Sequence, residues 1–274
     1  MKPAPFAYEE PRSAEEAVGL LARYGDEAKV LAGGQSLIPL LNFRLARPER
    51  LVDVNRIDDL AYIRRRDGVL HLGALARMAA LERSPLVAAR WPLLVEAARL
   101  VGHPQIRSRG TVGGSVAHAD PAAELPAALT ALGASFHLTS QRGTRTLAAE
   151  EFFITHLTTA LEPDELLIEI TVPPLPPRTG TAIVEHARVH GDFALGGTAV
   201  VVEAGRASIV LLAAGPTPLR AVAAEEALVG GAAVDEVAEL AAGVMDATRG
   251  DYRRALAREL TRRALVLAHE RAAA

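Results

Sequence analysis

Two glycine-rich segments, LAGGQSLIP at Leu31–Pro39 and RGTVGGSVAHADPAAELPA at Arg109–Ala127, are the most informative features of this 274-residue chain. Each segment pairs adjacent glycines with a hydroxyl side chain. That combination lets a backbone come close to a phosphate group and direct N–H groups at it. An ordinary tight turn after a buried strand is the alternative explanation of either glycine pair. Two such segments on one chain favour a ligand with two phosphates and a long body, such as a dinucleotide cofactor.

Neither segment matches the common phosphate-binding motifs. GGQSL lacks the Lys-Ser or Lys-Thr that follows the glycines of a nucleoside-triphosphate loop. Neither segment has the G-x-G-x-x-G spacing with which a Rossmann turn opens a helix. The sequence therefore predicts that a dinucleotide is held in another way.

The composition is that of a globular protein that is long enough for two domain cores. Half of the residues are hydrophobic and the formal net charge is −3, so we expect no general attraction to nucleic acid. No apolar stretch has transmembrane length. The chain contains no cysteine, which excludes disulfides and a thiolate-ligated iron–sulfur cluster within it and fits a reducing cytoplasm.

Apolar periodicity divides the chain into helices and strands around a proline-rich break. Ser13 is the expected N-cap of a helix that runs to Tyr24, with Glu16 three residues further on. PPLPPRTG at Pro173–Gly180 cannot continue a helix or a central strand, so we interpret it as a linker between domains. Residues 55–67 are expected to form a connection with short structure. Other helices are expected near 78–81, 92–101, 221–229, 234–245 and 251–271, and strands near 29–32, 51–54, 69–72, 135–138, 145–147, 166–172, 181–188, 195–203 and 207–213.

Taken together and in order, the motifs resemble the FAD-binding medium subunit of the molybdenum hydroxylase family. That family includes the medium subunit of aerobic-type carbon monoxide dehydrogenase and the FAD-binding subunit of xanthine dehydrogenase. The similarity begins with FAYEEPRSAEEAVGLLARYGDEAKVLAGG and continues through AGGQSLIPLLNFRLARPERLVDVNRI and TVGGSVAHADPAAELPAAL. It then includes LEPDELLIEITVP, ARVHGDFALGGTAV and AAGPTPLRAVAAEEAL, and it ends with DYRRALARELTRRAL. Several motifs in register are much more specific than a single glycine loop.

The resemblance implies an α+β fold in two parts. A two-lobed FAD-binding domain of the vanillyl-alcohol-oxidase/PCMH-like type is expected over residues 1–175, with the lobes split near 55–60. A C-terminal α+β domain of the CO dehydrogenase flavoprotein type, an antiparallel sheet with helices, is expected over residues 178–274.

The same resemblance implies an electron-transfer oxidoreductase subunit. Electrons are expected to pass from 2Fe–2S clusters of a partner subunit, through non-covalently bound FAD, to an external acceptor such as NAD, a quinone or oxygen. The expected partners are a molybdopterin-binding large subunit and a 2Fe–2S small subunit, in a dimer of heterotrimers, located in the cytoplasm or at the inner face of the membrane. A stand-alone flavin oxidoreductase and a non-catalytic scaffold subunit stay open as alternatives. The substrate of the molybdenum site is not encoded in this chain.

The resemblance also assigns cofactor-binding residues. The first flavin loop matches Ala32, Gly33, Gly34, Gln35, Ser36 and Leu37, and the second matches Thr111, Gly113, Gly114 and Ser115. Relatives often have His at the position of Gln35, so a covalent flavin–histidine link is excluded here, whereas hydrogen bonding is retained. Further candidates at the cleft are His118, Asp120 and Glu124, and those near the flavin ring are Val101, Leu161 and Phe193.

Several of these residues have a second explanation. Asp120 is well placed to cap a helix that begins at Pro121, while Glu124 is assigned to the cofactor's hydroxyl groups. Phe193 could be a core residue. Two ligands without a third nearby make a metal at His118 and Asp120 an unattractive interpretation, and no metal ligand or catalytic side chain is expected. The remaining candidates, Arg44, Arg47 and Arg50, could pair with phosphate but fit a solvated surface better.

Overall fold

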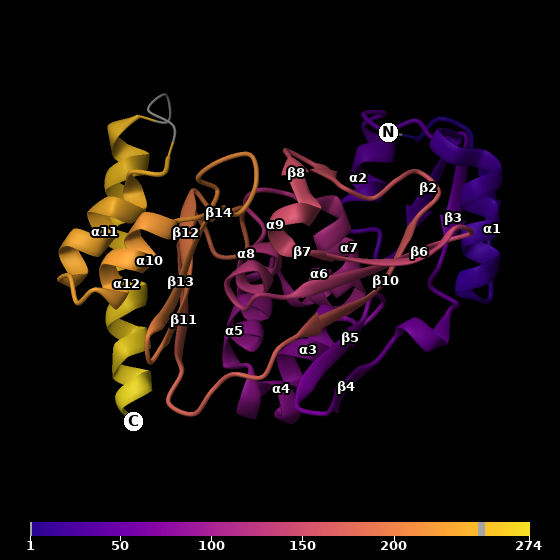
Figure 1. The fold of residues 1–274 in the computed structure, drawn as a ribbon. Helices are drawn as coiled ribbons and strands as arrows, with labels where there is room; N and C mark the ends of the chain where they lie inside the picture. The colour runs from indigo at the N-terminus through magenta and orange to yellow at the C-terminus, as the bar shows by residue number, and fades with distance from the viewer. Residues whose placement is uncertain (1, 246–249) are drawn as a thin grey trace.

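The computed structural model describes residues 2–245 and 250–274 and has an α+β architecture built in layers (Figure 1). At one end lies a parallel sheet of order β1-β3-β2, formed by Ala7–Glu9, Arg50–Asp53 and Ala28–Leu31. Helix α1 (Ala14–Tyr24) packs against it and begins as predicted, because the Ser13 hydroxyl accepts the Glu16 N–H at 3.0 Å. The short helices here are η1 (Gly25–Glu27), α2 (Leu37–Asn42) and η2 (Asp58–Leu60).

The middle of the molecule is a five-stranded antiparallel sheet of order β4-β5-β10-β6-β7. Its strands are β4 (Ile63–Arg66), β5 (Val69–Gly73), β10 (Leu166–Val172), β6 (Ser135–Ser140) and β7 (Gly143–Ala148). The helices between β5 and β6 are α3 (Met78–Arg83), α4 (Pro85–Arg90), α5 (Pro92–Leu100), α6 (Pro104–Arg109), α7 (Val112–His118) and α8 (Glu124–Ala131). The short helix α9 (Ala149–Phe152) leads into the hairpin of β8 (Phe153–Thr155) and β9 (Thr158–Thr159).

Beyond the proline-rich segment lies an antiparallel sheet of order β11-β12-β13-β14. Its strands are Gly180–His186, Gly196–Glu203, Arg206–Leu212 and Leu219–Arg220. Helices α10 (Val222–Val229), α11 (Val234–Ala242) and α12 (Asp251–Ala273) cover one face, and α5 and α8 contact the other (Figure 1). The alternation of the strands explains this arrangement: Val200 and Ile209 face α12, whereas Val201 and Val210 join the core around α8.

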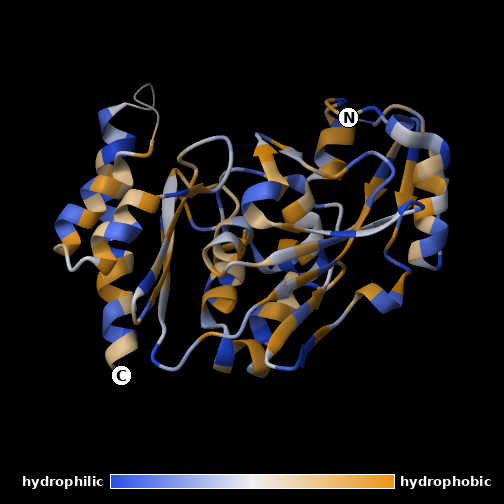
Figure 2. Cartoon of the chain, viewed as in Figure 1, coloured by the Kyte–Doolittle hydropathy of each residue, from blue (hydrophilic) through white to orange (hydrophobic). Residues whose placement is uncertain are grey.

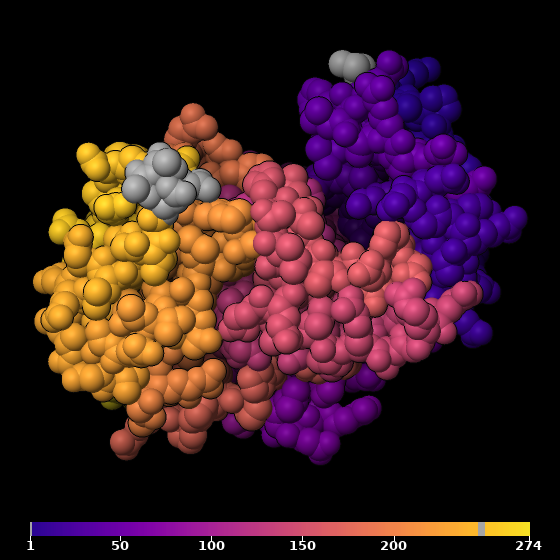
Figure 3. Space-filling view, turned by 45° about the horizontal axis from the view of Figure 1, so that its top comes forward, coloured from indigo at the N-terminus to yellow at the C-terminus, as the bar shows by residue number. Residues whose placement is uncertain are grey.

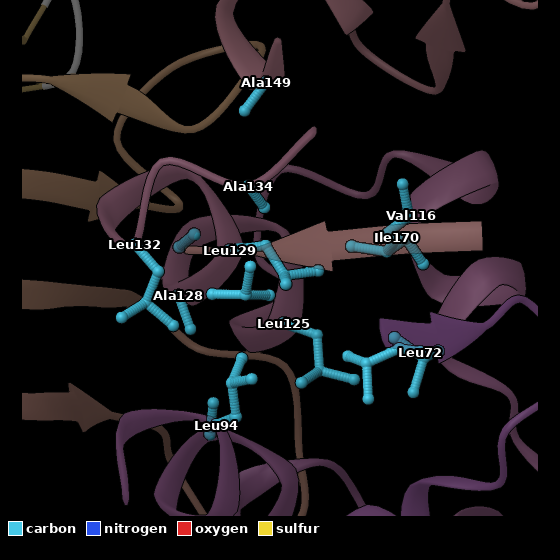
Figure 4. Close-up of a cluster of buried hydrophobic side chains, with 14 of the residues drawn as sticks. Leu72, Leu94, Val116, Leu125, Ala128, Leu129, Leu132, Ala134, Ala149 and Ile170 are labelled. Atoms are coloured by element: carbon cyan, nitrogen blue, oxygen red, sulfur yellow. The ribbon is translucent and has the colours of Figure 1, made fainter. Parts of the chain in front are cut away.

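Helix α8 lies in the centre of the largest core cluster, and each of its residues is buried. Leu125, Ala128, Leu129 and Leu132 point toward Leu72, Leu94 and Ile170 of the surrounding elements (Figure 4). The same cluster includes Ala199 and Val210 from beyond Pro173–Gly180. The indole N–H of Trp91 also donates to the Pro173 carbonyl at 2.7 Å, so the proline-rich segment is fixed against α5.

The hydropathy pattern agrees with this layering. Figure 2 shows apolar residues concentrated on the strands and the inner helices, whereas polar and apolar residues alternate along the outer helices α1, α11 and α12. In the described ranges no helix is both long enough and apolar enough to cross a membrane.

Most predicted elements are present, with two kinds of correction. The sequence analysis did not predict several short elements, because their apolar residues are too few or too closely spaced to show a period. These elements are β1, β4, β8, β9, β14, α2, α4, α6, α7 and α9. The helix expected from Pro121 begins instead at Glu124. Asp120 lies outside it, and its Oδ1 accepts the Ala122 N–H at 2.9 Å, which closes a turn rather than capping α8. The predicted end of α11 at Met245 is three residues beyond the observed end at Ala242.

Phe136 offers a direct test of the core. It is fully buried and packs against Phe152 and Phe153, with ring centroids 4.6 and 5.7 Å away. We expect Phe136→Ala to lower the free energy of unfolding by about 3–5 kcal/mol through lost burial and a residual cavity. The control, Phe43→Ala, removes a side chain that is 66% exposed and should change it by no more than about 0.5 kcal/mol. Urea denaturation measures both; equal losses would contradict the packing described here.

Candidate functional site

The two glycine segments meet backbone to backbone. A Cβ atom on Gly33 would lie 2.6 Å from the Arg109 carbonyl oxygen and 2.8 Å from the Gly110 Cα, so only glycine fits there. Gly34 has φ +73°, in the left-handed region that favours glycine. In Figure 3 a hollow opens between the indigo N-terminal lobe and the pink segment that contains residues near 150.

The first loop offers a continuous run of hydrogen-bond donors. Within residues 2–245 and 250–274, no acceptor receives the backbone N–H groups of Gly33, Gly34, Gln35, Ser36 and Leu37. The loop is shaped from within, because the Gln35 side-chain amide donates to the Gly33 carbonyl at 2.9 Å and the Ile38 N–H donates to the Gly34 carbonyl at 3.0 Å. Adjacent backbone N–H groups of this kind form an anion-binding concavity.

The second segment differs, because the protein itself uses its amides. Those of four successive residues donate within the chain: Val112 to Ala76 O at 2.9 Å, Gly113 to Ala74 O at 2.9 Å, Gly114 to Thr111 Oγ1 at 3.1 Å and Ser115 to Thr111 O at 3.1 Å. A Cβ on Gly113 would lie 2.7 Å from the Ala74 carbonyl oxygen, and one on Gly114 would lie 2.6 Å from the Thr111 hydroxyl. These glycines therefore serve packing and the N-cap of α7, and the half-buried Ser115 is left to contact a ligand through its hydroxyl.

Two residues that the sequence analysis did not select brace the loops. The Asn55 amide donates to the Ala32 carbonyl at 2.6 Å, and its oxygen accepts from Arg77 at 2.8 Å. Arg77 also donates to the Arg109 carbonyl, so its guanidinium connects the second segment to the first through Asn55. Asn55 follows β3, the parallel neighbour of β2, and carboxyl ends of parallel strands meet at one edge. This position after a strand could have identified Asn55 from the sequence. No sequence pattern marks Arg77.

Two guanidinium groups lie near each other where the glycine segments meet, with the Asp53 carboxylate close to both. Burial and the positive charge of the neighbouring Arg109 lower the pKa of Arg77, which indicates that the two guanidinium groups repel each other. The Arg109 side chain is exposed and has no hydrogen-bond partner among the described residues.

The arginines that follow the first loop bind elsewhere. Arg44 donates to the Lys2 carbonyl at 3.2 Å, Arg47 donates to the Arg44 carbonyl at 3.0 Å, and Arg50 stacks over Tyr24 with 4.0 Å between its guanidinium and the ring centroid. Arg77 and Arg109 are instead the arginines that lie where the two glycine segments meet.

The residues after α7 form a second, more acidic region. His118 is half-buried, and burial lowers the pKa of its imidazole despite the opposing effect of Asp120. Glu124 is only 7% exposed, and burial together with the Glu185 carboxylate raises the pKa of Glu124 to about 8. Glu185 was not selected from the sequence, because nothing local relates a strand residue to a helix start 61 positions earlier.

The three apolar candidates differ in exposure. Val101 and Leu161 are half-buried against the main core. Phe193 is 67% exposed in the loop between β11 and β12, so its interpretation as a core residue is wrong. That loop lies against the two residues after Val101, because a Cβ on Gly191 would lie 2.5 Å from the His103 ring and 3.1 Å from the Gly102 carbonyl oxygen.

These residues fit a long cofactor that carries phosphates. Free amides and two guanidinium groups suit anionic phosphates, hydroxyl and carboxyl groups suit a polyol, and an exposed aromatic side chain suits a planar ring. No arrangement of nucleophile and general base was found among the residues that the structure places here.

The comparisons with known proteins agree with this chemistry. The model of the family described as "FAD binding domain in molybdopterin dehydrogenase" matches residues 4–175, more than half of the chain. The 6-hydroxypseudooxynicotine dehydrogenase complex subunit alpha of Paenarthrobacter nicotinovorans is 47% identical over 84% of this chain and 79% of the relative. The carbon monoxide dehydrogenase medium chain of Hydrogenophaga pseudoflava is 40% identical over the full length of both chains.

A solved structure of the same family has the same fold. Carbon monoxide dehydrogenase from Hydrogenophaga pseudoflava, in a form that lacks the Mo-pyranopterin moiety of the molybdenum cofactor, superposes with a TM-score of 0.94. Its matching chain is 42% identical, and the match covers 99% of each chain. The chain therefore belongs to the FAD-binding medium subunits of the molybdenum hydroxylase family, as an electron-transferring flavoprotein component of an oxidoreductase whose molybdenum and iron–sulfur cofactors lie on partner subunits.

Proposed function

We propose that the free amides of Gly33–Leu37 hold the pyrophosphate of FAD and that Arg109 neutralises part of its charge. The observation that carries this proposal is the run of five amides for which residues 2–245 and 250–274 provide no acceptor. The second segment supports the first loop through the Arg109–Gly110 backbone, which packs against Gly33, and it contributes the Ser115 hydroxyl. Of the two loops, the first supplies the donors and the second fixes their position.

The other candidate residues are proposed to surround the rest of the cofactor. His118, Asp120 and Glu124 provide polar groups for its hydroxyls, and Val101, Leu161 and Phe193 provide apolar contact for its ring. Bound FAD supplies the redox chemistry, so the residues of this chain need only orient the flavin and limit its contact with water. We propose the domain division of residues 1–175 and 178–274 on the same basis, with the family match at 4–175 in support.

The partners follow from the proposed electron path. We propose a complex with a molybdopterin-binding large subunit and a 2Fe–2S small subunit, as a dimer of heterotrimers in the cytoplasm or at the inner face of the membrane. Because the chain has no cysteine, a thiolate-bound cluster that delivers electrons must belong to another subunit. NAD, a quinone or oxygen is proposed as the acceptor.

Non-covalent binding of FAD is the first test. Gln35 occupies the position at which a histidine would be needed for a covalent link. Purified protein should be yellow, and acid precipitation should release the flavin into the supernatant. Flavin that stays on the pellet would contradict the non-covalent link, and colourless protein that cannot be reconstituted with FAD would contradict binding altogether.

Arg109→Ala tests the phosphate site. Removing its charge should weaken FAD affinity by at least about tenfold, equivalent to about 1.4 kcal/mol. Thermal stability should be unchanged, because the exposed side chain has no hydrogen-bond partner among the described residues. The matched control is Arg44→Ala, which removes a guanidinium bound to the Lys2 carbonyl. Flavin fluorescence titration measures both affinities; the same affinity in the two variants would refute the assignment of Arg109.

Co-expression tests the electron path. The isolated chain should bind FAD without oxidising any hydroxylase substrate. Together with a cysteine-rich iron–sulfur subunit and a molybdopterin subunit it should form a stable complex in which substrate bleaches the flavin. Substrate-dependent bleaching by the isolated chain at the rate of the complex would support a stand-alone enzyme instead. Failure to associate with either subunit would contradict the proposed partners.

A further inference from the structure

Arg107 is a buried cation to which the proposed binding of FAD gives no role. It lies on α6, and only 8% of the residue is exposed. Its Nε donates to the Glu82 carboxylate at 2.8 Å, and its Nη1 donates to the Val101 and Gly102 carbonyl oxygens, both at 3.1 Å. One guanidinium therefore holds a backbone turn while a carboxylate from α3 neutralises its charge.

The local sequence explains why this side chain reaches back to the turn. Side chains of an α-helix lean toward its N-terminus. Arg107 is the fourth residue of α6 and its N–H donates to the His103 carbonyl at 3.1 Å, so its side chain extends toward the residues before the helix. Gly102 permits the turn because its φ is +47°, in the left-handed region. The turn also ends α5, since Val101 is the C-cap of that helix and a carbonyl at a helix end lacks an intrahelical donor.

Helix α6 joins this turn to the glycine segments. It contains six residues, so it is about 9 Å long at 1.5 Å per residue. It ends at Arg109, whose carbonyl oxygen lies against Gly33. Val101, a candidate for contact with the flavin ring, lies just before the other end. The ring-side candidate and the proposed phosphate loop are therefore separated by one short helix, and Arg107 belongs to that helix.

The loop that carries Phe193 rests on the same turn. A Cβ on Gly191 would lie 3.1 Å from the Gly102 carbonyl oxygen, which is the oxygen that accepts from Arg107. Gly191 also has φ +84°, so both its conformation and its contact with the turn favour glycine. Two of the three candidates for ring contact, Val101 and Phe193, are thus carried by backbone that Arg107 holds directly or through the turn.

The end of α5 alone does not explain a charged pair at this place. Apolar side chains of similar volume stabilise a buried site as well as an ion pair does, or better. Such side chains cannot donate hydrogen bonds to the two carbonyl oxygens of the turn. The feature that distinguishes Arg107 from an apolar residue is therefore its hold on the turn, and not its contribution to the core.

We propose that Arg107 is a positioning residue for the flavin ring, which acts through the carbonyls of Val101 and Gly102. The inference rests on the proposed function, and it adds a residue that contacts neither the phosphates nor the ring. Without these hydrogen bonds the turn and the loop of Phe193 lose their fixed position. The ring then loses apolar contact, while the phosphate site at Gly33–Leu37 is kept.

ADP separates the two ends of the cofactor, because it carries a pyrophosphate but no flavin ring. The double variant Arg107→Met/Glu82→Met leaves neither charge unpaired, so we expect its thermal unfolding midpoint to be kept. The affinity of its apoprotein for FAD should fall by at least about tenfold, whereas its affinity for ADP should change by less than about twofold. Isothermal titration calorimetry measures both affinities.

Two further variants separate positioning from stability. Arg107→Lys keeps a charge beside Glu82, but its compact ammonium lacks the planar fork that reaches the carboxylate and both carbonyls. It should lose FAD affinity by at least about threefold, again without a loss for ADP. Arg220→Met is the control, because it breaks the pair with the buried Glu225 in the C-terminal sheet, where the Nη2–Oε2 distance is 2.9 Å. It should lower the unfolding midpoint and leave both affinities unchanged.

The combined outcomes separate the two proposals. Absence of FAD or ADP binding by the unmodified apoprotein would overturn the proposed function and, with it, this inference. Unmodified FAD affinity in the double variant and in Arg107→Lys would overturn the inference alone, since Arg107 would then only stabilise the fold. Equal losses for FAD and ADP would overturn it as well, because the effect would not be confined to the ring. A loss confined to FAD in a stable variant supports it.

Discussion

The site depends on the contact between the Gly33 backbone and the Arg109–Gly110 backbone. No side chain fits between these segments, so the loop after β2 is pressed against the start of the second glycine segment. The Asn55 and Arg77 side chains fix this contact from one side through the Ala32 and Arg109 carbonyls. The carbonyls of this loop are thereby held, while its amides have no acceptor among the described residues.

Two similar motifs consequently have different tasks. The amides of the second segment close the N-cap of α7 and join the loop after β5, so they are unavailable to a ligand. In the first loop Gln35 and Ile38 donate to the Gly33 and Gly34 carbonyls, and the amides of Gly33–Leu37 find no acceptor in the described part of the chain. The first loop therefore provides the phosphate-binding amides, whereas the second segment, at the start of α7, keeps that loop in position.

The C-terminal sheet completes the site as well as the core. Its inner face packs on α8 in the main cluster, and the loop that carries Phe193 lies against Gly102 and His103. A flavoprotein subunit needs no catalytic acid or base of its own, so its residues can specialise in holding and tuning the cofactor. A chain without cysteine fits that task, because the clusters belong to its partners.

The sequence by itself determined the family, the α+β class, most strands and helices, and the glycine loops. These depend on local patterns, such as the Ser13 cap and the proline break, which short-range sterics and hydrogen bonding specify. The tertiary structure decided which amides stay free, that Asp120 lies outside α8, and that Arg77 rather than Arg44 accompanies the loops. It also brought the loop of Phe193 to the Gly102 carbonyl. Such facts depend on contacts between segments far apart in the chain, and no local pattern encodes which backbone groups those contacts leave unpaired.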